Sequence, residues 1–581
     1  MGSSTPASAS NKGVRVFPYD RAMPKSMFET RVSRDTWLFW IAALLILGAG
    51  IGLRDPWPAD EPRFALAAKQ MVESGDWLFP HRGIELYSDK PPMLMWLQAT
   101  FFEVFRNWRV AFLLPSLLAT LMTLACVKDL GKRLWTPKIG LWAAWAVLLA
   151  FQFTYQAKKA QIDPLVTGLI TLANYGLLRH LLLGPNWRWW WIGWFAAGLG
   201  TITKGVGVLA LLMLVPAIYA GVRGWQSRGE RVSLHLRDWR LWIAPVFFVA
   251  AMAIWLLPMV MTVQSRHDPV YDAYLNDILF HQTAKRYAQS WDHAQPWWYF
   301  IVVVVGMWLP AMLALPWAIP AWKRRLQRMD ARYLLPLVWG VLLVVFFSIP
   351  SGKRDVYIMP VLPMWGLALA PLLPGLLKKV WPRRLLATVL AVMAIGFVVG
   401  GALMAFGHSK STTRFLTERG LESGVGLGWM LLAMGAGVIV ALAWRRRRLE
   451  IATLVSLGTM WVLFSVFGYP LLNDSSSARG LMRDVGTRIG SDAQLALLGW
   501  KEQNLLMADR PATNFGFTRD MQAQTVDAIH WLQVDPQHRW LLVQDTVLPK
   551  CIPDSGLEQV PHSNRRTWYL VRGSAVMECP H

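Results

Sequence analysis

Residues 60–92 read DEPRFALAAKQMVESGDWLFPHRGIELYSDKPP and form a charged stretch between two apolar segments. The first apolar segment ends just before it, and the next begins near residue 109. Acidic and basic side chains at the mouth of a membrane protein are costly to hold and usually serve a function. We therefore treat residues 60–92 as the centre of the candidate site and interpret the rest of the chain around them.

The composition indicates a polytopic α-helical membrane protein. Hydrophobic residues make up 54% of the 581 residues and charged residues only 16%, with a mean hydropathy of +0.32. A soluble protein normally carries about 25% charged residues. The net charge of +23 lies mostly in short loops between apolar runs, where membrane topology places Lys and Arg. This pattern accounts for the basic pI, and we expect no nucleic-acid partner.

Apolar runs of about 20 residues, each long enough to cross the hydrocarbon core, predict about thirteen transmembrane helices. An odd number places the two termini on opposite sides, and the Lys and Arg clusters place the N-terminus in the cytoplasm. The predicted spans are 36–53, 109–127, 139–156, 162–183, 187–203, 205–222, 241–263, 297–317, 333–350, 356–376, 385–406, 425–443 and 451–471.

These spans divide the chain into three parts. We expect residues 1–35 to form a cytoplasmic tail and residues 36–472 a transmembrane domain, in which 54–108 is the first periplasmic loop and holds the candidate catalytic residues. Helical spacing of apolar residues after Asp60 and again after Pro92 predicts two juxtamembrane helices in that loop, lying on the outer leaflet.

Residues 473–581 are expected to form a small periplasmic α/β domain. Strand-like runs occur at 494–498, 540–544 and 567–571, and residues 525–532 have a helical pattern. Cys551 and Cys579 lie in this tail and could form a disulfide after export to an oxidising compartment, whereas Cys126 lies in a membrane segment.

Asp60 precedes a helix that has Pro62 in its first turn, so it is a candidate N-cap residue. A carboxylate in that position stays ionised. It could also take a proton from a hydroxyl that attacks a sugar. Glu61 either shares this work or is a solvated acid of the first helical turn.

Several cations lie against the orientation rule, at the predicted outer ends of the helices. Cations in such places are candidates to bind an anion such as a phosphate. The alternative is that Arg63 and Lys90 form surface ion pairs with neighbouring acids, which contribute about 0 to 1 kcal/mol each. The outer-face residues concerned are Arg63, Lys90, Lys158, Lys159, Lys204, Arg286, Lys353 and Arg354, with Asp163 and Tyr357 beside them.

Five motifs resemble the C-type glycosyltransferases that include the bacterial aminoarabinose transferases of lipid A and the protein O-mannosyltransferases. They are 60–65, 74–77, 89–92, 203–205 and 352–360, which read DEPRFA, SGDW, DKPP, TKG and GKRDVYIMP. The resemblance covers roughly residues 36–363. It implies thirteen transmembrane helices, two juxtamembrane helices and a periplasmic C-terminal domain. It also implies transfer, with inversion, from an undecaprenyl-phosphate-linked sugar at the periplasmic face of the bacterial inner membrane.

The resemblance also suggests roles for individual residues. Asp60 is similar to the family's catalytic carboxylate, and we place Glu61 beside it. Asp89 stands where the family often has Glu, and His281 is the nearest match to a His of the second outer loop; a divalent metal is left open. The donor-phosphate residues are Arg63, Lys90, Arg286, Lys353, Arg354 and Tyr357, and the supporting residues are Asp163 and Lys204.

Three other functions are compatible with parts of the sequence. A secondary transporter would place polar residues near the membrane midplane in repeated halves, whereas here the charges gather at one face. A membrane scaffold would leave Asp60 and Lys90 replaceable. Protein O-mannosylation would use the same type of polyprenyl-phosphate donor, with a protein instead of a lipid as the acceptor. The sequence does not identify the sugar or choose between these acceptors.

Overall fold

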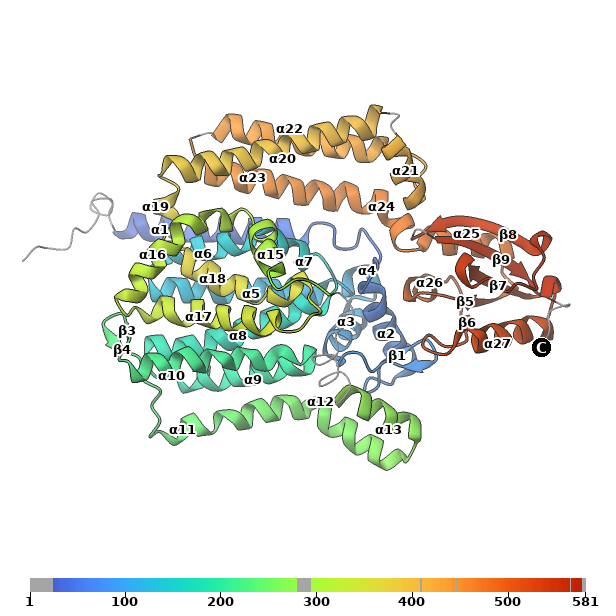
Figure 1. The fold of residues 1–581 in the computed structure, drawn as a ribbon, viewed down its shortest axis with the longest axis horizontal. Coiled ribbons are helices and arrows are strands. Elements are labelled where there is room, and N and C mark those ends of the chain that lie inside the picture. Colours follow the sequence, from blue (N-terminus) through green and yellow to red (C-terminus); the bar gives the residue numbers. More distant parts are fainter. Residues whose placement is uncertain (1–24, 280–293, 408–409, 446, 565, 577–581) are drawn as a thin grey trace, which may run out of the picture.

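The computed structural model describes residues 25–279, 294–407, 410–445, 447–564 and 566–576. The chain is a polytopic helical membrane protein with a small mixed β-sheet region at its C-terminal end. Figure 1 shows the helices as one large body, the sheet region at the other end, and the first loop between the two.

Among the described residues, seven helical segments are long and apolar enough to cross a membrane, or up to nine if two bent pairs each count as one span. The seven are Trp108–Leu134 (α4 and α5), Ile162–Leu183 (α8), Trp239–Arg266 (α11 and α12), Ala331–Ser348 (α17), Val380–Phe406 (α20), Val425–Arg445 (α22) and Leu449–Ser476 (α23, η6 and α24).

Two of the predicted spans are not straight helices. The span at 139–156 is α6 (Pro137–Leu148) followed by α7 (Phe151–Ala157) at 71°, and the span at 297–317 is α15 (Tyr299–Met307) followed by Ala311–Gln327 (η4 and α16) at 103°. The two breaks meet, because the N–H of Phe151 donates to the carbonyl of Leu309 at 2.9 Å. At each break one backbone group has no partner within its own helix, and this hydrogen bond pairs the two groups with each other.

Four further helical segments lie at other predicted spans. They are α1 (Lys25–Gly48), α9 (Trp187–Lys204), η2 with α10 (Val206–Met213 and Leu214–Val222), and α18 (Val361–Leu369). The predicted span at 356–376 is divided into η5 (Asp355–Ile358), α18 and α19 (Leu373–Leu376). Prolines at 360, 371 and 374 explain this division, because a proline has no N–H to continue the helix.

The two helices expected in the first loop are present as α2 (Glu61–Ser74) and α3 (Met93–Phe105). Their expected position flat on the leaflet is wrong for α2, which is buried between two parts of the protein. Ala65 and Leu66 pack against the C-terminal region, while Phe64 and Met71 pack in the cluster that contains α3 and α8. The helix ends at Gly75, which has a left-handed φ of 75°.

The C-terminal region contains a five-stranded sheet in the order β6-β5-β7-β9-β8. The strands β5, β6 and β7 are parallel, and β9 joins β7 and β8 antiparallel. The three predicted strands and the predicted helix are confirmed, while β6 and β8 were not predicted. The elements are α25 (Arg479–Ile489), β5 (Gln494–Leu498), α26 (Glu502–Leu506), β6 (Ala512–Asn514), α27 (Met521–Val534), β7 (Arg539–Gln544), β8 (Leu557–Ser563) and β9 (Arg566–Arg572).

The expected pairing of cysteines is covered only in part by the described residues. Cys551 is disulfide-bonded, and Cys579 lies outside the described residues. Cys126 is buried and free in α5.

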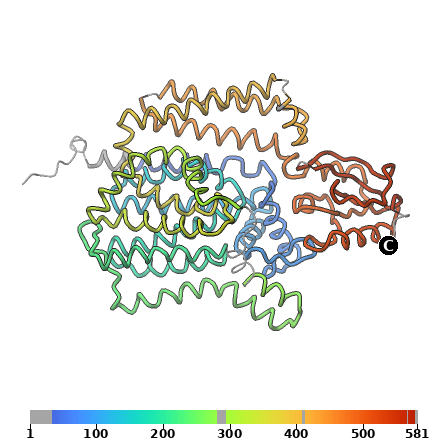
Figure 2. Tube along the Cα trace, viewed as in Figure 1, coloured from blue at the N-terminus to red at the C-terminus, as the bar shows by residue number. Residues whose placement is uncertain are grey.

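Figure 2 shows that α20, α22 and α23 run together along one side of the helical body. α23 continues through the π-helical η6 (Phe464–Gly468) into α24 (Tyr469–Ser476), which leads into the C-terminal region. The side chain of Asn473 in α24 donates to Asp55 at 2.8 Å, so this end of the layer is tied to the first loop.

Candidate active site

Asp60 lies at the start of α2, and its carboxylate contacts two other parts of the chain. Its backbone carbonyl accepts the N–H of Phe64 at 3.4 Å, but its side chain makes no capping bond. Oδ2 of Asp60 instead accepts from Nη2 of Arg354 at 3.0 Å and from Nε2 of Gln161 at 3.1 Å. The backbone of Asp60 thus occupies the N-cap position of α2, whereas its carboxylate binds the side chains of a separate polar cluster.

The surroundings of Asp60 keep its carboxyl group ionised. Burial alone would raise the pKa of Asp60, but the positive charge and hydrogen bond of Arg354, followed by the charges of Arg63 and Lys204, lower this pKa below its ordinary value. The side chain is 16% exposed. A carboxylate that remains ionised at neutral pH can accept a proton or attract a developing positive charge.

A second ion pair lies beside the first. Lys204, the last residue of α9, pairs with Asp163 in the first turn of α8. The ammonium of Lys204 lies 5.0 Å from the ring centre of Tyr357 in η5, a distance at which a cation and an aromatic face attract. The charges of Asp163 and Asp60 both act on Arg354.

The cluster therefore combines residues from four separate segments: the first loop, the start of α8, the end of α9 and the segment leading into η5. We call it the Asp60 cluster, and it consists of Asp60, Gln161, Asp163, Lys204, Arg354 and Tyr357. Within it an ionised acid lies beside two fixed cations, an arrangement that can bind an anion and hold a base next to it. Arg354 has 39% of its side chain exposed and is accessible to a ligand.

Glu61 is buried outside this cluster. Its two carboxylate oxygens accept from Nη1 and Nη2 of Arg54 at 2.5 and 2.7 Å, and from the N–H groups of Trp57 and Ala160, both at 2.8 Å. With only 3% exposure, Glu61 is not a solvated acid of the first turn. Its oxygens are engaged in joining α2 to the start of α8, so this geometry does not favour the expected catalytic role.

Arg63 connects the first loop to the C-terminal region. Its Nε donates to Oε1 of Glu502 at 2.9 Å, and Nη1 of Arg82 lies 3.7 Å from the same oxygen. Glu502 is buried, and Arg82 also stacks on the ring of Phe517 at 3.9 Å. One buried carboxylate thus fixes two arginines of the first loop, and Arg63 is close enough to Asp60 to lower its pKa.

Lys90 and Lys353 are held by backbone carbonyl groups. Lys90 donates to the carbonyl of Asp89 at 2.7 Å, and the Asp89 carboxylate lies 3.8 Å from Arg82. Lys353 is buried and donates to the carbonyls of Pro350 and Gln295 at 2.7 and 3.0 Å. Lys353 therefore has a local structural role that does not favour the expected contact with a donor phosphate.

Arg286, expected to bind the donor phosphate, and His281, the candidate for the metal that the sequence left open, lie outside the described residues. Within the described ranges there is no group of three or more His, Cys, Asp and Glu side chains that could hold a metal ion.

Sequence reasoning missed two residues of this region. Gln161, which donates to Asp60, lies between the flagged Lys159 and Asp163, and this proximity was the available signal. Glu502 had no local signal, because it meets Arg63 from 439 residues away along the chain.

Comparisons with known proteins find similar sequences over most of the chain. A family model described as dolichyl-phosphate-mannose-protein mannosyltransferase matches residues 89–255. The chain is 29% identical over 370 residues to the undecaprenyl phosphate-alpha-4-amino-4-deoxy-L-arabinose arabinosyl transferase of Pseudomonas savastanoi pv. phaseolicola, covering 63% of this chain and 66% of that protein. It is 28% identical over 450 residues to the protein of the same name from Pseudomonas aeruginosa strain UCBPP-PA14, covering 74% of this chain and 75% of that protein.

The fold is similar to the crystal structure of ArnT from Cupriavidus metallidurans bound to undecaprenyl phosphate. The TM-score is 0.72 at 20% sequence identity, with 92% of this chain and 97% of that chain covered. The apo structure of that protein gives a TM-score of 0.71. Over most of its length the chain is thus similar in sequence to aminoarabinose transferases, and a part of it matches the mannosyltransferase family model.

Proposed function

We propose that this protein transfers 4-amino-4-deoxy-L-arabinose from undecaprenyl phosphate to lipid A. The names of its relatives and the undecaprenyl phosphate bound by the related ArnT support the sugar and the carrier. The observation that carries the proposal is the Asp60 cluster, in which an ionised carboxylate shares its site with Arg354 and Lys204.

The chemistry follows from these charges. The bond between the anomeric carbon and the phosphate oxygen breaks, and a bond to an acceptor oxygen forms on the opposite face of the sugar, with inversion. Negative charge then grows on the departing polyprenyl phosphate, where guanidinium and ammonium groups stabilise it. Asp60 accepts the proton of the attacking acceptor hydroxyl. Arg354 and Lys204 have positions suited to the phosphate, and Arg63 adds positive charge near Asp60. Lys90 and Arg286 stay candidates from the sequence alone.

The same proposal includes the membrane arrangement. Adding α1, α9, η2 with α10, and α18 to the segments that pass the length and hydropathy test gives about thirteen spans. Basic clusters such as Lys132–Arg133 and Arg447–Arg448 lie at the end of the helices away from the Asp60 cluster. The positive-inside rule then puts the N-terminus in the cytoplasm, and the Asp60 cluster and C-terminal region in the periplasm of a bacterial inner membrane.

Replacing Asp60 by Asn tests the function. We expect Asp60→Asn to insert normally and to lose about 10²- to 10⁴-fold in transfer rate, because the base is lost with little change of shape. Mass spectrometry of lipid A from cells that depend on this protein measures the loss. Glu73→Gln, which removes an exposed carboxylate from the end of the same helix, is the matched control and should retain full transfer.

The acceptor is tested in the same cells. If lipid A from cells with active wild-type protein lacked the added sugar, lipid A would be ruled out as the acceptor. If mannosylated protein accumulated in its place, the alternative of protein O-mannosylation would be correct. Full activity of Asp60→Asn would remove Asp60 from the mechanism and favour the scaffold or transporter alternatives.

A further inference from the structure

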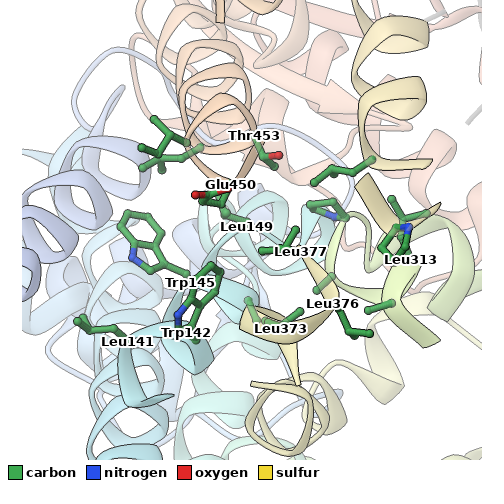
Figure 3. Close-up of a pocket in the computed structure, with 18 of the residues that line it drawn as sticks. Leu141, Trp142, Trp145, Leu149, Leu313, Leu373, Leu376, Leu377, Glu450 and Thr453 are labelled. Carbon is green, nitrogen blue, oxygen red and sulfur yellow. The ribbon is translucent and has the colours of Figure 1, made fainter. Parts of the chain in front are cut away.

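An apolar cavity of about 490 Å³ lies where α20 and α23 meet the helical body. Figure 3 shows Trp142 and Trp145 of α6 on one side, with Leu149 directly after that helix. Leu373 and Leu376 of α19 lie on another side, with Leu377 directly after that helix. The lining is almost entirely apolar, and its polar members are Asp35, Lys138, Glu450 and Thr453. A cavity of this size is in the range that holds a small ligand or part of a lipid.

The cavity lies at the end of the helical body away from the Asp60 cluster. α23 begins beside the cavity, where Glu450 and Thr453 contribute to the lining, and its continuation reaches Asn473, which is bonded to Asp55. The 28-residue segment Leu449–Ser476 spans about 40 Å at 1.5 Å per residue. Because a hydrocarbon core is about 30 Å thick, the cavity opens near the membrane surface opposite the candidate active site.

Basic residues gather at the chain junctions next to the cavity. Lys138 is part of the lining and is exposed. Arg383 donates to the carbonyls of Leu377 and Arg447, so the start of α20, the end of α19 and the turn between α22 and α23 meet at this point. The basic residues at these junctions outnumber the carboxylates of Asp35 and Glu450, and they are Lys138, Lys378, Lys379, Arg383, Arg384, Arg447 and Arg448.

Apart from their contact with the helical body, the helices that line the cavity are little buried inside the protein. Only 17% of the apolar window of α20 and 39% of that of Leu449–Ser476, which contains α23, is buried inside the protein. The layer of α20, α22 and α23 therefore relies on its contact with the body, and the cavity lies within that contact. An apolar occupant would restore dispersion contacts that an empty space forfeits.

We propose that this cavity binds one acyl chain of an anionic phospholipid, whose phosphate lies among the basic residues at the opening. The apolar lining matches a hydrocarbon chain, and the excess of cations matches a net negative head group rather than a zwitterionic one. Basic pockets between transmembrane helices bind anionic lipid head groups in this way. The polyprenyl donor is a poor fit, because its phosphate belongs at the Asp60 cluster at the opposite membrane surface. The inference does not depend on the proposed transfer reaction.

Native mass spectrometry of the full-length, delipidated protein tests the site directly. Dioleoylphosphatidylglycerol should give a one-lipid adduct and raise the melting temperature, and dioleoylphosphatidylcholine should bind at least about fivefold more weakly. Lys138→Gln should weaken phosphatidylglycerol binding about fivefold, whereas Glu450→Gln should strengthen it, since each changes the charge at the opening. Ala146→Trp, which fills the cavity from α6, should abolish the adduct.

Two variants control for general effects. Val392→Trp adds an indole to an exposed position of α20, and Arg414→Gln removes an exposed charge elsewhere; both should bind phosphatidylglycerol as the wild type does. Equal binding of phosphatidylcholine or phosphatidylethanolamine would overturn the proposal. So would an undiminished adduct in Ala146→Trp, or specific binding of undecaprenyl phosphate that this variant removes. If Ala146→Trp fails to fold, the opposite shifts in Lys138→Gln and Glu450→Gln still decide the outcome.

Discussion

Opposing influences set the pKa of Asp60. Burial raises the pKa of Asp60, and the neighbouring cations, with Arg354 foremost, lower it further than burial raises it. An ionised Asp60 is needed if it acts as a base, so activity should fail only when the pH drops through this lowered pKa. Since an ordinary Asp has a pKa of about 3.9, the acid limit of activity should lie below that value.

Replacing Arg354 by Gln should move this acid limit to higher pH. The substitution removes the strongest of the influences that lower the pKa of Asp60, so the carboxylate would become protonated earlier as the pH falls. A pH–rate profile of the purified enzyme measures the shift. Arg414→Gln should leave the profile unchanged, and an unmoved acid limit in Arg354→Gln would contradict the assignment of Asp60 as the base.

Candidate site residues could be predicted where charged residues lie close together in the sequence. Asp60, Asp163, Lys204, Arg354 and Tyr357 were all flagged because each lies at the end of an apolar run, and the structure places them together. Their assigned roles stay proposals. The burial of Glu61 was not predicted, because its partner Arg54 lies outside the charged stretch and adjacency in sequence does not reveal which carboxylate faces inward.

At the scale of elements, α2 is held by a buried ion pair. Arg54 and Glu61 have side-chain exposures of 2% and 4%, so removal of one partner leaves an uncompensated buried charge. Glu61→Gln should therefore lower the free energy of unfolding by about 3 to 5 kcal/mol. Thermal unfolding in detergent measures this effect, with Glu73→Gln as control. A melting temperature equal to that of the wild type would show that the pair does not anchor the helix.

The element α26 should influence transfer although it belongs to the C-terminal region. Glu502→Gln leaves Arg63 and Arg82 without their shared carboxylate, and we expect kcat/KM to fall at least about tenfold, the equivalent of about 1.4 kcal/mol. The matched control is Glu558→Gln, an exposed carboxylate of β8 that pairs with Arg488. Equal kinetics for both variants would separate the C-terminal region from the reaction.

The breaks within apolar runs could not be predicted from the sequence. Hydropathy correctly located the segments at 139–156 and 297–317 but not their bends. The bend between α6 and α7 depends on the Phe151–Leu309 backbone bond and on Gln152, which accepts from Trp308 at 2.6 Å. Such partners lie more than 150 residues away in the chain, and a local pattern contains no information about them.

At the scale of the whole molecule, the proposed orientation is open to a labelling experiment. Cysteine introduced as Asp527→Cys should react with a membrane-impermeant maleimide in intact spheroplasts, whereas Arg447→Cys should react only after lysis. The expectation rests on the basic clusters at one end of the helices and the C-terminal region at the other. The native Cys126 is buried and Cys551 is disulfide-bonded. The reverse pattern of labelling would contradict the orientation.

The general architecture was readable from composition and periodicity, because membrane helices and exposed loops differ strongly in apolar content. The contact between the first loop and the C-terminal region could not be predicted in this way, because it depends on individual polar contacts. Asp55 with Asn473, Glu85 with Thr518, and Arg63 with Glu502 all link residues more than 400 positions apart.

The burial of α2 against the C-terminal region has a consequence for how the protein is made. Arg63 emerges from the ribosome 439 residues before Glu502, an interval of roughly 20 to 90 s at 5 to 20 residues per second. During that time the nascent first loop has been synthesised but lacks the surface that later covers it. A ribosome that stops short of the last hundred or so codons therefore leaves a membrane-inserted chain with an incomplete pocket, so assembly of the enzyme waits for the end of translation.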